Sequence, residues 1–177
     1  MGKASITKNT PLNYVLNLTH PCKCEACANG CKYGSGFLVE EDIPRIANHL
    51  GITKEVLKKE FLEEFEKFNT KKFRPRILKK GKQYGKCIFF DKEIGCKIHK
   101  AKPLECKISM GCTDYGEQLS LWFMLNYFVN ENDPESIRQF SIYLKSGGKT
   151  LPAAELKDLV PDMEKLKKIL SFQILKS

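Results

Sequence analysis

The placement of eight cysteines constrains this chain more than any other feature of its sequence. Four of them fall within ten residues, and four more follow between positions 87 and 112. They are Cys22, Cys24, Cys27, Cys31, Cys87, Cys96, Cys106 and Cys112. Thiols that only fill a core have no reason to be spaced so closely. Since deprotonated thiols are strong ligands of zinc and of iron–sulfur clusters, all eight are candidate metal ligands.

The redox compartment decides between metal ligation and disulfides. No stretch approaches the roughly 18 apolar residues of a membrane helix. Residues 1–8 lack the apolar core that is typical of a secretory signal. These features predict a cytoplasmic protein that does not contact a membrane. Cytosolic thiols stay reduced, which favours metal ligation, although intracellular disulfides of the kind found in some hyperthermophiles are the alternative.

The type of metal is left open by the ligand types. All-sulfur ligation suits both zinc and iron–sulfur clusters, so ligand softness does not decide between them. Eight cysteines are enough for two four-sulfur zinc sites, or for one 4Fe–4S cluster with spare thiols. His20 and His99 lie close to cysteines in the sequence and are minor candidates to replace one.

The apolar pattern predicts an α+β fold that is mainly α, with a small β-hairpin and cysteine-bearing loops around a metal centre. We expect a strand at 14–18, a helix at 41–50 that ends at Gly51, and a helix capped by Thr53 that continues to Phe65. Cys87 and Cys96 are expected on the two strands of one hairpin, and Cys106 and Cys112 on a loop or short helix after Pro103.

The last third of the chain is free of cysteine and helical in pattern. We expect a buried helix from Glu117, a helix that starts after Asp133-Pro134, and a Lys-rich amphipathic helix at 161–175. The sequence therefore predicts a cysteine-cluster metal-binding domain over residues 1–115. A helical extension over residues 116–177 is expected to pack on it.

The cysteine motifs resemble those of a known family. The motifs are Cys24-x-x-Cys27-x-x-Gly30-Cys31, then Phe37-Leu38 with Asp42-Ile43-x-Arg45-Ile46-Ala47, then Cys87-Ile-Phe-Phe, Gly95-Cys96-Lys-Ile-His99 and Lys102-Pro103-Leu104-Glu105-Cys106. Together they are similar to the YkgJ-type cysteine-cluster family, also called CxxCxxCC, over about residues 20–115. The resemblance implies a zinc- or iron-chelating domain, with Cys24, Cys27, Cys31, Cys87, Cys96 and Cys106 as ligands.

The departures from the family pattern affect the ligand set. An adjacent pair of cysteines in the family is Gly30-Cys31 here, and Cys22 is an additional cysteine that compensates for the loss. A related domain occurs in the flagellin lysine N-methylase, which together with the spare thiols favours 4Fe–4S over zinc. No Gly-x-Gly-x-x-Gly motif for a nucleotide-type methyl donor is present.

Positive charge is concentrated in residues 67–86. This basic segment contains nine of the 30 basic residues and no acidic one, which leaves 21 basic against 21 acidic residues elsewhere. Such a segment, interleaved with aromatic residues, is a candidate site for nucleic acid or another polyanion. The candidate contacts are Lys71, Lys72, Arg74, Arg76, Lys79, Lys80 and Lys82. A solvated loop, or a local counter-charge for thiolates, explains the same composition.

Two functions of different classes follow from these motifs. The first is a protein that holds a 4Fe–4S cluster and acts as a cluster-dependent enzyme or redox protein. The second is a structural zinc module that binds RNA or a protein partner through residues 67–86. No acid–base pair or nucleophile stands out, so the sequence leaves open whether the protein is an enzyme.

Overall fold

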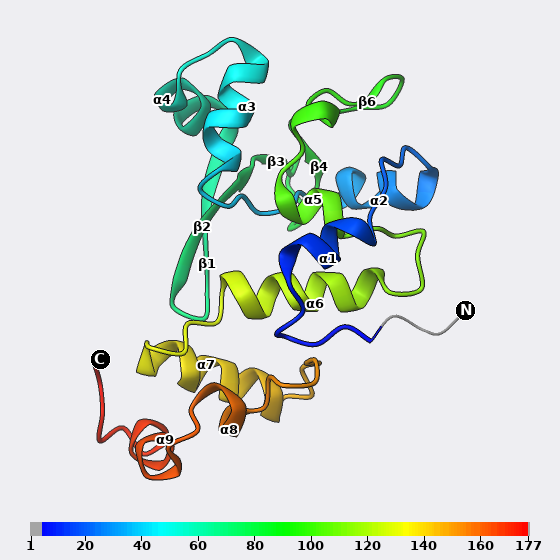
Figure 1. The fold of residues 1–177 in the computed structure, drawn as a ribbon. Coiled ribbons are helices and arrows are strands. Elements are labelled where there is room, and N and C mark those ends of the chain that lie inside the picture. The colour runs from blue at the N-terminus through cyan, green and yellow to red at the C-terminus, as the bar shows by residue number, and fades with distance from the viewer. Residues whose placement is uncertain (1–4, 177) are drawn as a thin grey trace. The chain divides into compact units, whose positions relative to one another are not determined.

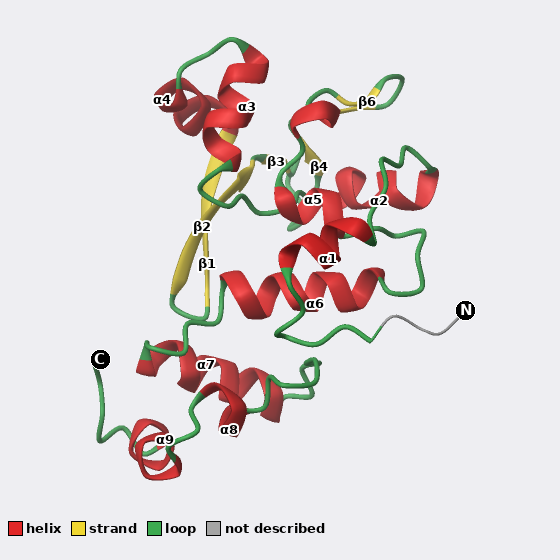
Figure 2. Cartoon of the chain, in the orientation of Figure 1, coloured by secondary structure: helices red, strands yellow, loops and turns green. Residues whose placement is uncertain are grey.

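Helix is the main secondary structure, and the strands form only small hairpins (Figure 2). The computed structural model describes residues 5–176. The predicted class, α+β and mainly α, is confirmed. The helices are α1 (Leu12–Asn17), α2 (Glu25–Tyr33), α3 (Asp42–Leu50), α4 (Lys54–Val56), η1 (Leu57–Phe61), η2 (His99–Ala101), α5 (Leu104–Ile108), α6 (Gly116–Tyr127), α7 (Pro134–Lys145), α8 (Leu156–Leu159) and α9 (Met163–Leu170) (Figure 1). The strands are β1 (Leu62–Lys67), β2 (Thr70–Pro75), β3 (Ile77–Leu78), β4 (Lys86–Cys87), β5 (Phe90–Asp91) and β6 (Gly95–Cys96).

The chain folds as two compact units, each built from more than one segment. The cysteine unit consists of residues 13–65 and 72–117, and it contains all eight cysteines. The helical unit contains the described residues of the segments 1–12, 66–71 and 118–177. The domain boundary that the sequence indicated, after residue 115, stays a prediction.

The hydrophobic core of the cysteine unit joins α3 and η1 to the segment 87–101. Ile46 and Leu57 are fully buried in it. Cys87 is one of its buried members, and Cys31 and Cys96 pack against it. Several candidate ligands are therefore fixed by the same packing that stabilises the unit.

The start of the cysteine unit confirms some predicted helix ends and corrects others. The helix that was expected at 41–50 is α3, and Gly51 ends it with a left-handed φ of 67°. Thr53 caps the next helix, accepting a hydrogen bond from Val56 N–H at 3.2 Å. The helical segment continues through η1 and ends at Phe61 instead of Phe65, because 62–67 pairs as β1 with β2. Phe68 and Asn69 both have positive φ, which a tight two-residue hairpin turn requires.

Two further expectations were wrong in detail. Residues 14–18 do not form a strand, because most of them belong to the helix α1. Cys87 and Cys96 lie on different hairpins: Cys87 pairs with Ile77 across β3–β4, and Cys96 pairs with Phe90 across β5–β6. The close approach of β4 to β3 depends on Gly85, where a Cβ would lie 2.2 Å from the Leu78 carbonyl oxygen.

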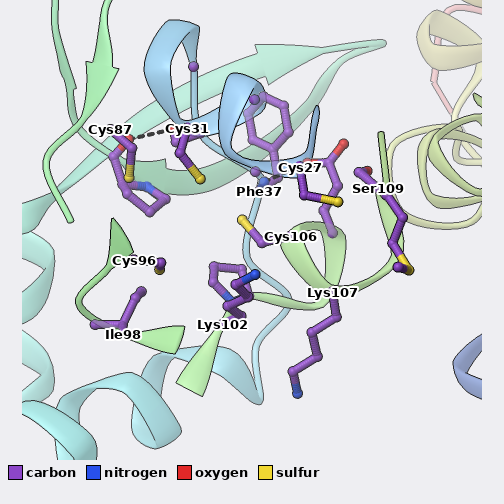
Figure 3. A pocket seen from close by; sticks show the side chains of 18 of the residues that line it. Cys27, Cys31, Phe37, Cys87, Cys96, Ile98, Lys102, Cys106, Lys107 and Ser109 are labelled. Atoms are coloured by element: carbon purple, nitrogen blue, oxygen red, sulfur yellow. Dashed lines mark hydrogen bonds between the residues drawn. The ribbon is translucent and has the colours of Figure 1, made fainter. Parts of the chain in front are cut away.

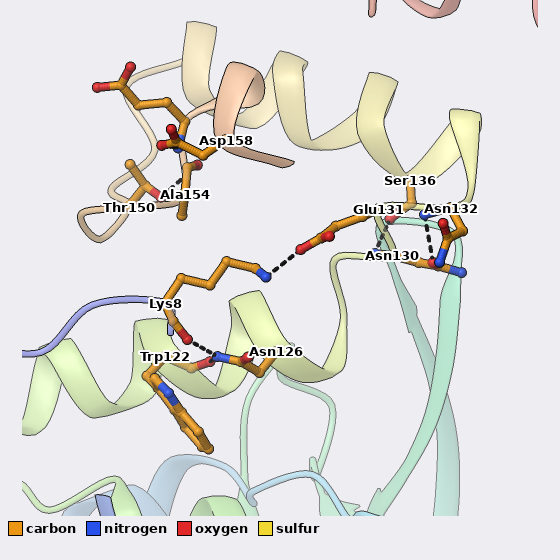
Figure 4. Close-up of polar contacts among 11 residues, drawn as sticks. Lys8, Trp122, Asn126, Asn130, Glu131, Asn132, Ser136, Thr150, Ala154 and Asp158 are labelled. Carbon is orange, nitrogen blue, oxygen red and sulfur yellow. Dashed lines mark hydrogen bonds and ion pairs between the residues drawn. The ribbon is translucent and has the colours of Figure 1, made fainter. Parts of the chain in front are cut away.

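The helical unit follows the predicted capping signals. The Asp133 side chain accepts a hydrogen bond from Glu135 N–H at 3.0 Å and starts α7. Lys8 forms an ion pair with Glu131, and Asn126 Nδ2 donates to the Lys8 carbonyl oxygen at 3.0 Å (Figure 4). The last helix, expected at 161–175, is the shorter α9.

None of the helices within residues 5–176 combines the length and the apolar character that crossing a membrane requires.

A buried carboxylate connects α3 to the beginning of α5. Asp42 is 1% exposed, and its Oδ2 accepts hydrogen bonds from the backbone N–H groups of Val39 and Leu104, both at 2.9 Å. Its Oδ1 forms an ion pair with Arg45, whose Nη2 also donates to the Lys102 carbonyl oxygen at 2.9 Å. This network fixes the helix that carries one of the cysteines.

We expect Asp42→Ala to lower the free energy of unfolding by about 2–5 kcal/mol, because it leaves two buried N–H groups, and the partly exposed Arg45, without their partner. Glu40→Ala, an exposed carboxylate two residues away, should change it by less than about 0.5 kcal/mol. Urea unfolding followed by circular dichroism measures both values. Equal effects of the two variants would contradict the role assigned to Asp42.

Candidate metal centre

Four sulfurs from two parts of the sequence come together at the beginning of α2. The Sγ atoms of Cys22, Cys24, Cys27 and Cys112 all lie within 4.8 Å of one another. We call these residues the compact set. The Cys112 Sγ is 3.6 Å from the Cys22 Sγ and 3.5 Å from the Cys27 Sγ. All four are free thiols.

The local backbone explains this convergence. Cys24 is the N-cap residue of α2 and Cys27 lies in its first turn, so both sulfurs lie at the same helix end. Cys112 arrives on the loop after α5, where Gly111 packs against α2. A Cβ on Gly111 would lie 2.7 Å from the Ala26 carbonyl oxygen, so only glycine permits this approach.

The spacing of the compact set suits one tetrahedral ion. Four sulfurs at about 2.3 Å from a zinc ion stand about 3.8 Å from one another. The separations of 3.5 and 3.6 Å are close to that value. In a 4Fe–4S cluster each cysteine binds a different iron, which holds the four sulfurs further apart. The compact set therefore fits a mononuclear site better than a cluster.

The thiols of the compact set differ in acidity. A hydrogen bond from the Cys27 backbone N–H and another with the Cys22 side chain lower the pKa of Cys24 to about 7. The Cys27 and Cys22 side chains raise the pKa of Cys112 to about 12. Cys24 therefore offers a thiolate that is ready to bind a cation at neutral pH.

The other four cysteines border a cavity of about 280 Å³ (Figure 3). We call them the cavity set, and they are Cys31 of α2, Cys87 of β4, Cys96 of β6 and Cys106 of α5. In Figure 3 the sulfurs of Cys31, Cys87 and Cys106 face the same space. Among the described residues, the compact set is the one group of three or more His, Cys, Asp or Glu side chains whose ligand atoms all lie within 4.8 Å of one another. The sulfurs of the cavity set do not meet this limit, so they are more widely spaced.

Burial controls the acidity of the cavity set. Loss of solvation raises the pKa of Cys31 and Cys96, and it raises that of Cys87 to about 12. Burial also raises the pKa of Cys106 well above its ordinary value, and the charges of neighbouring thiolates add to the effect. Without metal these thiols stay protonated at neutral pH, so metal binding here must release protons.

Backbone contacts fix the position of Cys106 at the cavity. A Cβ on Gly36 would lie 2.6 Å from the Cys106 Sγ, so the chain before α3 passes directly against this sulfur. The Phe37 N–H donates to the Glu105 Oε2 at 2.6 Å and joins the same two segments. No local signal in the sequence marks either Gly36 or Glu105 for this purpose.

The structure divides the eight predicted ligands into two sets of four. Cys22 and Cys112, which the family resemblance did not include, complete the compact set with Cys24 and Cys27. His20 lines the cavity of about 280 Å³, but neither His20 nor His99 belongs to the compact set. The identity of the eight cysteines as metal ligands stays a prediction.

Two candidates for polyanion binding already have partners within the protein. Arg74 pairs with Glu63 at 2.8 Å, and Arg76 donates to the backbone carbonyl oxygens of Leu62 and Lys59. The turn around Gly81 carries the exposed lysines Lys79, Lys80 and Lys82. Binding of nucleic acid by the basic segment stays a prediction, and these lysines are among its exposed candidate contacts.

Comparison with known proteins agrees with the cysteine pattern. The family model CxxCxxCC, described as a putative zinc- or iron-chelating domain, matches residues 23–137. The resemblance seen in the sequence is confirmed, and the match extends beyond residue 115 through α6 and into α7. No curated protein and no solved structure matches the chain.

We expect the metal-free protein at pH 7 to react with iodoacetamide first at Cys24, because the thiolate is the nucleophile. Cys87, with its pKa of about 12, should react at least about a hundredfold more slowly than Cys24. Mass spectrometry of the digested protein measures each rate. Cys112 is the control, because it is exposed but has a raised pKa. Equal rates at Cys112 and Cys24 would show that exposure, and not ionisation, sets the reactivity.

Proposed function

Because this chain belongs to the CxxCxxCC family of putative zinc- or iron-chelating domains, we propose that it is a metal-binding protein with two metal centres. The compact set holds a single ion, and the ion we propose is zinc. The cavity set holds an iron–sulfur cluster, with 4Fe–4S favoured. The observation that carries this proposal is the division of eight thiols into one tight and one widely spaced set of four.

The geometry of the compact set supports a structural role for its ion. Four thiolates complete a tetrahedral shell and leave no position for a substrate. The ion would join the loop before α2 to the loop after α5, two segments that are far apart in the sequence. Its contribution is therefore to the stability of the cysteine unit.

The surroundings of the cavity set support a cluster. Its thiols come from four different elements and enclose a space of about 280 Å³, next to the hydrophobic core. A cluster bound there would supply electron transfer, or a Lewis-acidic iron if one thiolate did not bind. The protein's own residues exclude water from one side, through buried lining groups such as Ile98 and Met110.

The number of thiolates on the cluster distinguishes a redox protein from a cluster-dependent enzyme. Ligation by all four members of the cavity set closes the cluster and favours electron transfer. Ligation by three leaves one iron open to a substrate in the adjoining space. In the second case the open iron and its substrate would share the cavity of about 280 Å³ with Cys22 and Cys27 of the compact set, which also line it.

The first test is metal analysis with an absorption spectrum of protein purified without oxygen. We expect about four irons and one zinc per chain, with a broad absorption near about 400 nm from thiolate-bound iron. A colourless protein with two zinc ions would contradict the cluster. It would favour the alternative of a structural zinc module that binds RNA or a protein partner through its basic segment.

Two glycine substitutions should separate the centres without removing a ligand. Gly111→Ala pushes the Cys112 loop away from α2 and should lower the zinc content. Gly36→Ala displaces the Cys106 sulfur and should lower the iron content. Each variant is the control for the other, and Glu40→Ala is the control for both. Zinc and iron per chain, measured by elemental analysis, give the result.

Loss of both metals together in either glycine variant, with circular dichroism unchanged, would contradict two independent centres. It would indicate that all eight cysteines serve one site.

A further inference from the structure

A second cavity, of about 370 Å³, adjoins the metal region and is lined mainly by basic side chains. We call it the basic pocket. Its side chains with ionisable nitrogen atoms come from the loop before α2, from η2 and from the segment that includes α5. They are His20, His99, Lys100, Lys102 and Lys107.

Three lysines, Lys100, Lys102 and Lys107, bring positive charge to the basic pocket. None of the described residues that line it carries a carboxylate. Within the part of the chain that the structure describes, no carboxylate lies at ion-pair distance from Lys100, Lys102 or Lys107. Like charges around one partly enclosed space repel one another, and an anion placed between them removes that repulsion.

The basic pocket borders the metal region directly. Four residues, His20, Cys22, Lys102 and Lys107, line both this pocket and the cavity of about 280 Å³ that the cavity set surrounds. Cys22 is also a member of the compact set. A molecule held by the lysines would therefore lie beside the Cys22 sulfur, with the cavity of about 280 Å³ open to the rest of it.

From this juxtaposition we infer that the basic pocket binds the oxyanion group, a carboxylate or a phosphate, of a small-molecule ligand next to the metal centres. Lysine ammonium groups bind such groups through charge-assisted hydrogen bonds. The pocket deepens the proposed function by naming the class of ligand at that site. Its anion binding depends on the lysines and not on which metal is present.

The competing explanation is that the lysines only offset the negative charge of the metal–thiolate centres. The two explanations differ in what the lysines control. Counter-charges stabilise bound metal, so removing them lowers the metal content. Ligand-binding lysines can be neutralised with the metal content unchanged, and only anion binding is lost.

The test is isothermal titration of the protein, as isolated with its metals, with inorganic phosphate and with acetate at constant ionic strength. We expect saturable binding of at least one anion to one site, and the tighter of the two identifies the group. Lys100→Gln/Lys107→Gln should weaken that binding about tenfold or more, since it removes two charge-assisted hydrogen bonds to the anion. Lys102 is left intact in this variant because it lines both cavities.

The matched control is Lys54→Gln/Lys59→Gln, which removes the same charge from exposed positions of the same unit that lie outside both the basic pocket and the basic segment. It should bind the anion as the unchanged protein does. Equal weakening in both double variants, no saturable binding of either anion, or loss of metal from Lys100→Gln/Lys107→Gln would each overturn the inference.

A measurement on the unchanged protein guards against a folding defect in the variants. Acylation of lysines is mapped by mass spectrometry with and without the anion that binds. Protection of Lys100 and Lys107, with Lys54 and Lys59 unaffected, supports the pocket. Uniform acylation in both conditions overturns it.

Discussion

The buried carboxylate of Asp42 is the interaction on which the arrangement of the cysteine unit depends. It accepts hydrogen bonds from the backbone on both sides, at Val39 before α3 and at Leu104 at the start of α5. A carboxylate in this position is tolerated because its lone pairs are used and its charge is paired with Arg45. The Asp42 contacts also position two residues of the candidate sites. Cys106 lies on α5, and Lys102 of the basic pocket lies in the segment just before α5.

Close backbone contacts then determine which cysteine side chains lie near one another. Gly111 lets the loop with Cys112 lie against α2, and Gly36 lets the chain pass beside the Cys106 sulfur. Neither contact is possible with a larger residue at the glycine unless the neighbouring segment moves. The two sets of four thiols are therefore a product of backbone packing between segments that are distant in sequence, and not of the short cysteine spacings alone.

The sequence predicted what local signals determine. Gly51 at the end of α3, the Thr53 cap and the Asp133 cap were all recognisable, because each acts on its own helix end. The pairing of Cys87 with Ile77 was not recognisable, because it depends on β3, a two-residue strand within the basic segment. Short strands of this kind are fixed by tertiary contacts and carry little pattern of their own. The division of the cysteines depends on the same long-range contacts, so the candidate ligands were predicted but their grouping was not.

The two sets of thiols also differ in exposure and acidity, which affect how readily each would bind a metal. The compact set lies near the surface and contains Cys24, whose pKa of about 7 leaves a thiolate available at neutral pH. The cavity set is more buried, and its protons are held more strongly, as the pKa of about 12 at Cys87 illustrates. Metal binding there must overcome the cost of charging buried sulfurs, which a centre with several cations offsets better than a single ion does. Burial, spacing and cavity size thus favour the same assignment, with one ion at the helix end and a cluster in the interior.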